Sequence, residues 1–313
     1  MSKISSLSIS AMSARHAALK AGVPQDKPVL TLNKLSASAF HAMIVSAQEI
    51  LTGSANISLA GGMENLSSVP FVVRGARFGV PLTSSIMFED WLSSSNYDTY
   101  CSLPLFRVAD ILADMYGTRR EDVDEFALRS QKKWKAAHVK GLFNSEVVPV
   151  KVDVNGQEQL MTTDEFPRSD TTMETLSTLA PLFKGGVCTV GNVCGTNDGA
   201  AAIVLSSEEA LTKHNLTPLS RLMAWACVGV EPALMCTGPV VAVRSLLAAA
   251  RLTMEDIDLF EIHETFAAQA LICARELNVD PEKLNVNGGA IAIGHPSGAS
   301  GARLALHITL ELK

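Results

Sequence analysis

Residues 285–303, NVNGGAIAIGHPSGASGAR, decide the fold of this chain and place five glycines and one histidine between two apolar segments. Glycine weakens a regular helix or strand by roughly 0.5–1 kcal/mol, so this composition indicates a loop of special backbone shape. Gly288 and Gly289 permit a tight turn, and Pro296 keeps His295 out of the α region. The small residues that follow predict close backbone contacts at the start of a helix from Ala302 to Leu312.

A histidine in a folded protein is more often structural than catalytic. His295 stands in so rigid and glycine-rich a frame that the balance reverses, and we expect its ring to be presented from a fixed loop. The sequence therefore predicts a catalytic histidine at this position.

These residues resemble the signature of the thiolase family, the acyl-CoA acetyltransferases and 3-ketoacyl-CoA thiolases. The resemblance extends over nearly all of the chain and is greatest to the mitochondrial 3-ketoacyl-CoA thiolases. Four further segments carry it: Gly61-Gly62-Met63-Glu64, residues 73–79 (VRGARFG), residues 191–195 (GNVCG) and His263-Glu264-Thr265-Phe266.

The resemblance implies an α/β fold, a five-layer αβαβα sandwich of two similar halves with an inserted loop domain. The N-terminal half would comprise residues 1–65, completed by about 197–217. The loop domain would comprise residues 66–196, and the C-terminal half residues 218–313. Relative to the family, we expect the chain to be truncated at both ends, without the first strand and without the C-terminal Cys-x-Gly segment.

Hydrophobic periodicity predicts the elements in more detail. Expected helices cover residues 12–21, 39–51, 105–115, 121–138 and 208–214, and another begins at Thr265. Expected strands cover residues 28–33, 56–60, 200–205 and 257–263. The strands at 28–33 and 200–205 are expected to be buried, and the strand at 56–60 is expected to end at Gly61.

Composition limits the classes of function. The net charge is −6 and there is no basic tract, which argues against nucleic acid as a partner. The six cysteines show no metal-ligand spacing, so no metal site is expected. No apolar run suggests a membrane span. A mitochondrial location follows from the resemblance, with a cytoplasmic one as the alternative.

The resemblance assigns three catalytic positions. Ser36 stands where the family has its nucleophilic cysteine, at a turn from strand to helix. His295 would be the base that activates the nucleophile, and His263 would stand at the oxyanion hole, the group of donors that stabilises the developing oxyanion. The alternative for His263 is a buried histidine with satisfied hydrogen bonds.

Serine at position 36 changes the chemistry, because its hydroxyl ionises far above neutral pH and a helix dipole contributes at most about 2 kcal/mol. An oxygen ester is also more stable than a thioester, so the return of an acyl group to a thiol is unfavourable. The family's second catalytic cysteine lies in a Cys-x-Gly motif, and none of the six cysteines stands in one. These departures favour a poor nucleophile over an alternative one.

No permanently bound cofactor is expected, because coenzyme A and acyl-CoA are substrates in this family. The resemblance places Arg168 at the nucleotide end of CoA. Apolar positions would line the pantetheine channel, although each of these side chains taken alone is more often a core residue: Leu105, Phe183, Cys194, Met235 and Phe266.

Two hypotheses follow. In the first, the chain is an acyltransferase of fatty acid β-oxidation that acts on 3-ketoacyl-CoA or acetyl-CoA through an acyl-enzyme, by thiolysis or Claisen condensation. In the second, it is a catalytically silent CoA-binding or subunit-like protein. Both imply a homo-oligomer, or a hetero-oligomer with a full-length thiolase. A ketoacyl synthase is disfavoured by the combination of Gly294-His295-Pro296 with His263-Glu264-Thr265-Phe266.

Overall fold

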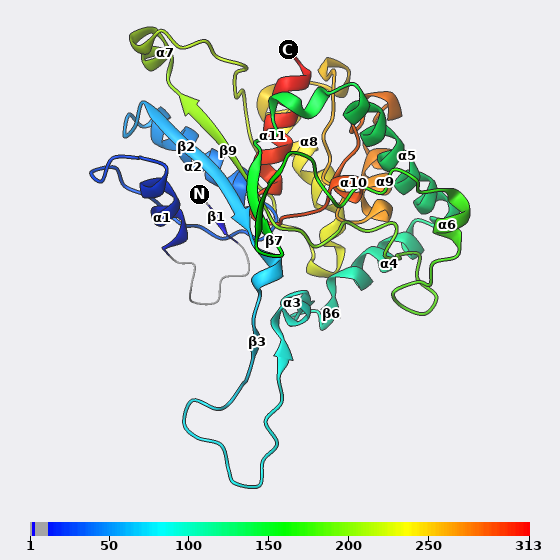
Figure 1. The fold of residues 1–313 in the computed structure, drawn as a ribbon. Coiled ribbons are helices and arrows are strands. Elements are labelled where there is room, and N and C mark those ends of the chain that lie inside the picture. The colour runs from blue at the N-terminus through cyan, green and yellow to red at the C-terminus, as the bar shows by residue number, and fades with distance from the viewer. Residues whose placement is uncertain (1, 4–11) are drawn as a thin grey trace.

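The computed structural model describes residues 2–3 and 12–313, which form an α/β fold (Figure 1). Its α-helices are α1 Ser13–Lys20, α2 Ser38–Leu51, α3 Trp91–Ser95, α4 Leu105–Met115, α5 Arg120–Val139, α6 Met173–Ser177, α7 Glu208–His214, α8 Gly238–Ala250, α9 Ala267–Glu276, α10 Ala290–Ile293 and α11 Ser300–Glu311. Its strands are β1 Ser2–Lys3, β2 Ile57–Glu64, β3 Phe71–Val72, β4 Glu89–Asp90, β5 Tyr97–Asp98, β6 Leu103–Pro104, β7 Val150–Val154, β8 Gln157–Met161 and β9 Gly199–Ser206.

The main sheet has the strand order β1-β2-β9. Strand β2 pairs with β9 in antiparallel register, from Ile57 opposite Ser206 to Glu64 opposite Gly199. Helices α2 and α11 pack against this sheet and against each other. Close approach requires glycine at two places: a Cβ added to Gly298 would lie 2.5 Å from the Met63 carbonyl oxygen, and one added to Gly301 would lie 2.7 Å from the Phe40 nitrogen.

The hydrophobic core lies mainly among α4, α5 and α9. Leu112, Phe266, Ile272 and Ile291 are its largest buried apolar side chains, each at most 2% exposed. Phe266 contacts Phe106 edge to face, with ring centroids 5.6 Å apart. This core supports the segments that carry the histidines described below.

An excursion between β3 and β4, residues 73–88, extends away from the body of the molecule (Figure 1). It carries fully or largely exposed apolar side chains, among them Phe78 at 97%, Leu82 at 106% and Phe88 at 74% exposure. Exposed apolar groups at this density are typical of interaction surfaces.

Most of the expected elements are confirmed. The predicted helices at 105–115 and 208–214 coincide with α4 and α7, and those at 12–21, 39–51 and 121–138 match α1, α2 and α5 to within one residue at each end. The helix expected from Ala302 begins at Ser300, and the one expected at Thr265 begins at Ala267.

The expected strands are less accurate. Residues 28–33 form no regular strand and Leu30 is 54% exposed, so the prediction of a buried strand is wrong. Residues 257–263 form only a single bridge, between Phe260 and Leu284. Extended segments become strands only where a partner supplies a ladder of hydrogen bonds, and the described residues supply none here.

The two strands of the main sheet also differ from expectation. Strand β2 runs through Gly61 to Glu64, because a Cβ at Gly61 would lie 2.4 Å from the Ala201 carbonyl oxygen and only glycine allows this pairing. Strand β9 is exposed on one face, with Val204 at 63%, where the sequence predicted a buried strand. The boundaries of the halves and of the loop domain stay predictions.

Within residues 2–3 and 12–313, one helical stretch, Pro232–Ala250, has the length and apolar composition of a membrane span, where the sequence suggested none. Composition carries little weight here, because the stretch begins as a 3-10 helix with a non-helical residue at Leu234. Arg244 also pairs with Glu276 across 3.7 Å. The same described residues contain no group of three or more potential metal ligands.

Candidate active site

Ser36 stands in the tight turn that leads into α2. Leu35, immediately before it, has a φ of +48°, a left-handed conformation that costs energy for a residue with a Cβ. The Ser38 hydroxyl donates a hydrogen bond to the Leu35 carbonyl at 2.6 Å and accepts one from the Lys34 amide at 2.8 Å. The strained turn is thus held in place, and with it the position of the Ser36 hydroxyl.

His295 is fixed by its own backbone. Its amide donates to the Gly195 carbonyl at 3.1 Å and to Asn197 Oδ1 at 3.2 Å. The preceding Gly294 has a φ of +93°, and a Cβ there would lie 2.0 Å from Asn197 Oδ1. The expected rigid presentation of the histidine is therefore confirmed, and Asn197 is an additional anchor that the sequence did not indicate.

Ser36, His295 and Ser300 form a continuous chain of hydrogen bonds. Ser36 Oγ lies 2.9 Å from His295 Nε2, and His295 Nδ1 lies 2.7 Å from Ser300 Oγ. The Ser300 hydroxyl also lies 3.3 Å from the Pro296 carbonyl, to which it can donate. In the tautomer with the imidazole proton on Nδ1, Nε2 is the acceptor for the Ser36 hydroxyl.

The imidazole of His295 is only 7% exposed. Burial, and secondarily the charge of Arg303, lowers the pKa of His295 to about 4. The ring is therefore neutral at pH 7 and able to accept a proton. Among the described residues no carboxylate contacts Nδ1, whose partner is the neutral Ser300 hydroxyl.

His263 lies beside His295, with ring centroids 4.2 Å apart and planes at 49°. Neither of its ring nitrogens has a hydrogen-bond partner among the described residues, although both are buried. Burial, and then the neighbouring His295, holds the pKa of His263 well below the ordinary histidine value. A buried polar group without a partner is costly. The oxyanion-hole position of His263 and its alternative as a satisfied structural histidine both stay predictions.

A buried carboxylate holds the segment that carries His263. Glu264 is 1% exposed and accepts hydrogen bonds from Ser130 Oγ at 2.7 Å, Asn285 Nδ2 at 2.8 Å and the Ile291 amide at 3.2 Å. A Cβ on Gly289 would lie 2.4 Å from the carboxyl carbon, which explains that glycine of the decisive stretch. Burial raises the pKa of Glu264, and these three donors oppose the rise.

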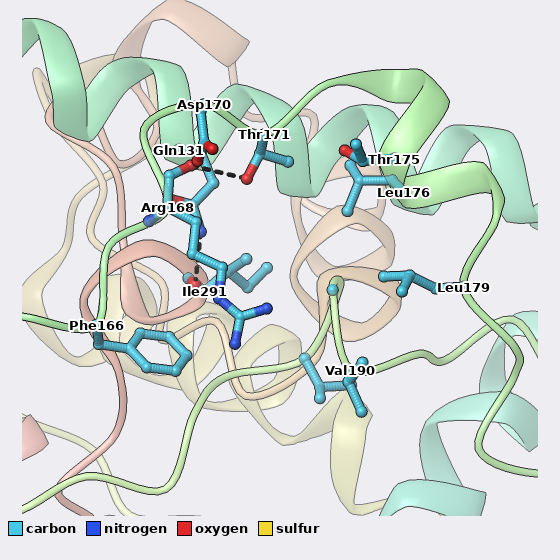
Figure 2. Close-up of a pocket in the computed structure, with 12 residues that line it drawn as sticks. Gln131, Phe166, Arg168, Asp170, Thr171, Thr175, Leu176, Leu179, Val190 and Ile291 are labelled. Carbon is cyan, nitrogen blue, oxygen red and sulfur yellow. Dashed lines mark hydrogen bonds between the residues drawn. The ribbon is translucent and has the colours of Figure 1, made fainter.

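A cavity of about 230 Å³ is lined in part by Ile291, whose amide contacts Glu264 (Figure 2). Ser36, His263 and His295 are not among its lining residues. Arg168 is exposed at its edge, and Figure 2 shows the guanidinium between Phe166 and Val190. The Arg168 guanidinium lies 5.7 Å from the centre of the Phe166 ring. The lining residues are Gln131, Phe166, Arg168, Asp170, Thr171, Thr175, Leu176, Leu179, Val190, Gly191, Val193 and Ile291. A cation beside apolar and aromatic walls suits a ligand with both phosphate and apolar parts.

Buried polar contacts fix the loop that forms one wall of the cavity. Asp110 Oδ1 accepts from the Val187 amide at 2.8 Å, and Asn192 Nδ2 donates to Asp124 Oδ1 at 2.7 Å. Arg120 pairs with the same Asp124 at 2.7 Å. Paired in this way, the buried carboxylates hold residues 187–192 in one conformation.

The structure brings Ser36, His263 and His295 together. Among the candidate CoA contacts, only Arg168 lines the cavity. The other five lie elsewhere: Phe266 is in the core, Leu105 and Met235 pack against it, and Phe183 and Cys194 are half-buried in loops. Burial raises the pKa of Cys194 to about 12, so its thiol is not ionised at neutral pH.

Sequence reasoning missed Ser300 and most of the cavity lining. Ser300 follows His295 by five residues within residues 285–303. Its position at the start of a helix was the only feature of the sequence that could have indicated a contact with His295. The lining comes from α5, α6, α10 and the loops between them, which no local pattern connects.

Two family models match nearly the whole chain: thiolase, N-terminal domain, over residues 1–209, and thiolase, C-terminal domain, over residues 216–313. Human mitochondrial 3-ketoacyl-CoA thiolase is 44% identical over 301 residues, which cover 96% of this chain and 76% of that protein. The acetyl-CoA acetyltransferase of Cupriavidus necator is 42% identical over 302 residues, covering 96% and 77%.

Solved structures of thiolases are also similar to this chain. The crystal structure of human mitochondrial 3-ketoacyl-CoA thiolase is similar with a TM-score of 0.97 at 43% identity, covering all of this chain and 80% of that one. The same enzyme in complex with CoA gives a TM-score of 0.95 at 42% identity, covering 100% and 78%. The fold expected from the sequence is thereby confirmed.

Proposed function

The chain belongs to the thiolase family, and from this premise we propose that it binds acyl-CoA and takes the acyl group onto Ser36. The observation that carries the proposal is the 2.9 Å contact between Ser36 Oγ and His295 Nε2. The names of the relatives support 3-ketoacyl-CoA and acetyl-CoA as substrates and a mitochondrial location, and fatty acid β-oxidation stays a prediction. The CoA-bound relative supports CoA as the ligand.

The residues have separable roles in this acyl transfer. His295 Nε2 accepts the proton as Ser36 Oγ attacks the thioester carbon, and the neutral His263 supplies an N–H to the developing oxyanion. Arg168, exposed beside the cavity, suits a phosphate of CoA. The pantetheine-channel roles of Leu105, Phe183, Cys194, Met235 and Phe266 stay proposals.

The test is direct acylation. Purified protein mixed with acetyl-CoA and quenched after a single turnover is expected to release one equivalent of CoA and to gain one acetyl mass, located on the Ser36 peptide by tryptic mapping. Ser54→Ala, which alters an exposed serine after α2, is the matched control and should acylate normally. An acyl group found on another residue would contradict the assignment of Ser36.

The alternative is a catalytically silent CoA-binding or subunit-like protein. It is favoured by the serine itself, because a hydroxyl is a weak nucleophile and His295 has no carboxylate on Nδ1. Saturable binding of CoA without acyl mass or CoA release would establish this alternative. The acylation experiment therefore separates the two functions.

We also infer that the protein self-associates, either as a homo-oligomer or with a full-length thiolase. The support is the excursion at residues 73–88, whose exposed Phe78, Leu82 and Phe88 would be costly in contact with water. Light scattering is expected to give a mass of at least twice 33.3 kDa. Phe78→Ser combined with Leu82→Ser should lower that mass, and a monomer before substitution would refute the inference.

A further inference from the structure

We propose that His307, a buried histidine on α11, is a proton-dependent latch. While protonated it holds the segment after α5 against α11, and when it loses its proton that segment loosens. The segment, residues 142–146, consists of the 3-10 turn Leu142–Ser145 and Glu146. The latch lies outside the cavity beside Arg168, because neither His307 nor Glu146 lines that cavity. It operates whether or not Ser36 is acylated, so it goes beyond the proposed function.

The segment touches α11 through His307. This side chain is on the inner side of α11 and only 3% exposed, and its Nδ1 lies 2.9 Å from Glu146 Oε1. Its ring also faces Phe143, with ring centroids 5.6 Å apart and planes at 32°. Phe143 in turn stacks on Trp134 of α5 at 6.3 Å. One imidazole therefore joins the segment to α11 by both an ionisable hydrogen bond and an aromatic contact.

Two carboxylate oxygens near this imidazole are buried without compensation. Glu146 Oε2 and Glu261 Oε2 have no hydrogen-bond partner among the described residues. The Glu261 side chain is 6% exposed, and its ion pair with Arg303 is long, at 3.7 Å. A buried carboxylate oxygen without a donor is costly. A proton on His307 lowers this cost, because it places a positive charge directly beside Glu146.

Acidic groups predominate around His307. The charged and titratable groups that face the cluster come from every element packed against it: His138 on α5, Glu146 after the 3-10 turn, Asp164 before α6, Glu261 and Glu264 before α9, and Arg303 and Glu311 on α11. Arg303 is the one permanent cation of this set. The surrounding charge therefore favours the imidazolium over the neutral ring.

The pKa shifts agree with this geometry. Burial lowers the pKa of His307, but the hydrogen bond and charge of Glu146, and then the charge of Glu261, outweigh burial and raise the pKa above 6.5. Burial raises the pKa of Glu261 to about 7, although Arg303 opposes the rise. Burial likewise raises the pKa of Asp164. All three groups hold their protons more tightly in the closed arrangement than in water.

Asn287 connects the latch to the glycine-rich stretch that leads to His295. Its Nδ2 lies 3.3 Å from His307 Nε2 and 2.7 Å from Glu311 Oε2, so it donates to both when the imidazole is neutral. The protonated imidazole carries a hydrogen on Nε2 and requires an acceptor there. A half-turn of the amide supplies Oδ1 to His307 and moves Nδ2 away from Glu311. Proton uptake by His307 thus exchanges the partners of Asn287.

The direction of the pH dependence follows from the raised pKa of His307. The contribution of its proton to closing is complete below 6.5, the ordinary value, and is lost as the pH rises through the higher pKa of the closed arrangement. His263 and His295 have lowered pKa values and oppose this trend in the stability of the whole chain. The test must therefore observe the segment itself.

Hydrogen exchange of the full chain provides that observation. For peptides covering residues 142–150, the protection factor, corrected for the effect of pH on intrinsic exchange, should fall by about three- to tenfold between pH 6 and pH 8.5. His307→Gln should remove most of this dependence, because glutamine is polar but takes no proton. His214→Gln, at an exposed histidine of α7, should retain it. Protection that is independent of pH in the unchanged protein, or equally dependent on pH in His307→Gln, would overturn the latch.

A titration of the unchanged protein makes the test independent of whether His307→Gln folds. In protein labelled with ¹³C-histidine, the NMR signal of His307 should titrate with a midpoint above 6.5. Glu146→Gln should lower that midpoint, because it removes the charge nearest the ring, and this shift also identifies the signal. A midpoint at or below 6.5 in the unchanged protein, or one that Glu146→Gln leaves in place, would refute the role of this pair.

Discussion

His295→Gln is expected to lower the rate of Ser36 acylation by about 10²–10⁴-fold, the usual contribution of a positioned general base. The Ser36 hydroxyl lies 2.9 Å from Nε2, which is an acceptor when the imidazole proton is on Nδ1. Glutamine can hold a hydrogen bond at this place but cannot take a proton. The measurement is CoA release in a single turnover, with enzyme in excess over acetyl-CoA.

Two further variants calibrate this result. Ser300→Ala removes one hydrogen bond to the base and should slow the same step by only about five- to tenfold, the equivalent of about 1 kcal/mol. His214→Gln alters an exposed histidine at the end of α7 and should change nothing. If His295→Gln acylated as fast as the unchanged protein, another group would have to be the base.

Glu264→Ala is expected to lower the free energy of unfolding by about 3–5 kcal/mol, because it leaves buried donors without an acceptor. Those donors are Ser130 Oγ, Asn285 Nδ2 and the Ile291 amide, all held within 3.2 Å of the carboxylate. Removal of the carboxyl group also leaves a cavity beside Gly289, which approaches the carboxyl carbon closely in the unchanged protein. Urea unfolding followed by circular dichroism measures the change.

The control for this variant lies on a neighbouring helix. Glu125, on α5 with Ser130, is exposed, and Glu125→Ala should change the stability by no more than about 0.5 kcal/mol. Similar losses for both variants would show that the hydrogen bonds of Glu264 contribute little beyond those of a surface carboxylate.

The helices were predicted well because the spacing of apolar residues that indicates a helix lies within the helical segment itself. The helix at 105–115 has its apolar residues on one face and turns out to be α4, with Val108 and Leu112 in the core. The prediction of a buried strand at 28–33 failed because a strand depends on segments far away in the sequence, and Leu30 is 54% exposed. Gly61 was taken as a strand end, although close contact with β9 makes it a strand interior.

Prediction of the candidate active site from the sequence was limited in the same way. Resemblance to a family identified Ser36, His263 and His295, which the fold brings together. The position of the imidazole proton depends on Ser300, and the absence of partners for His263 depends on the whole surrounding fold. Neither the position of this proton nor the surroundings of His263 can be read from the spacing of residues in the sequence. The cavity beside Arg168 likewise assembles from segments that are distant in sequence.

The close approaches at Gly298 and Gly301 have a kinetic consequence. They lock the start of α11 against the end of β2 and the start of α2, and these are the elements that carry or adjoin His295 and Ser36. We expect the backbone at the start of α11 to stay against β2 and α2 until this region unfolds. The half-life of this backbone arrangement on heating should then follow the unfolding rate of the region.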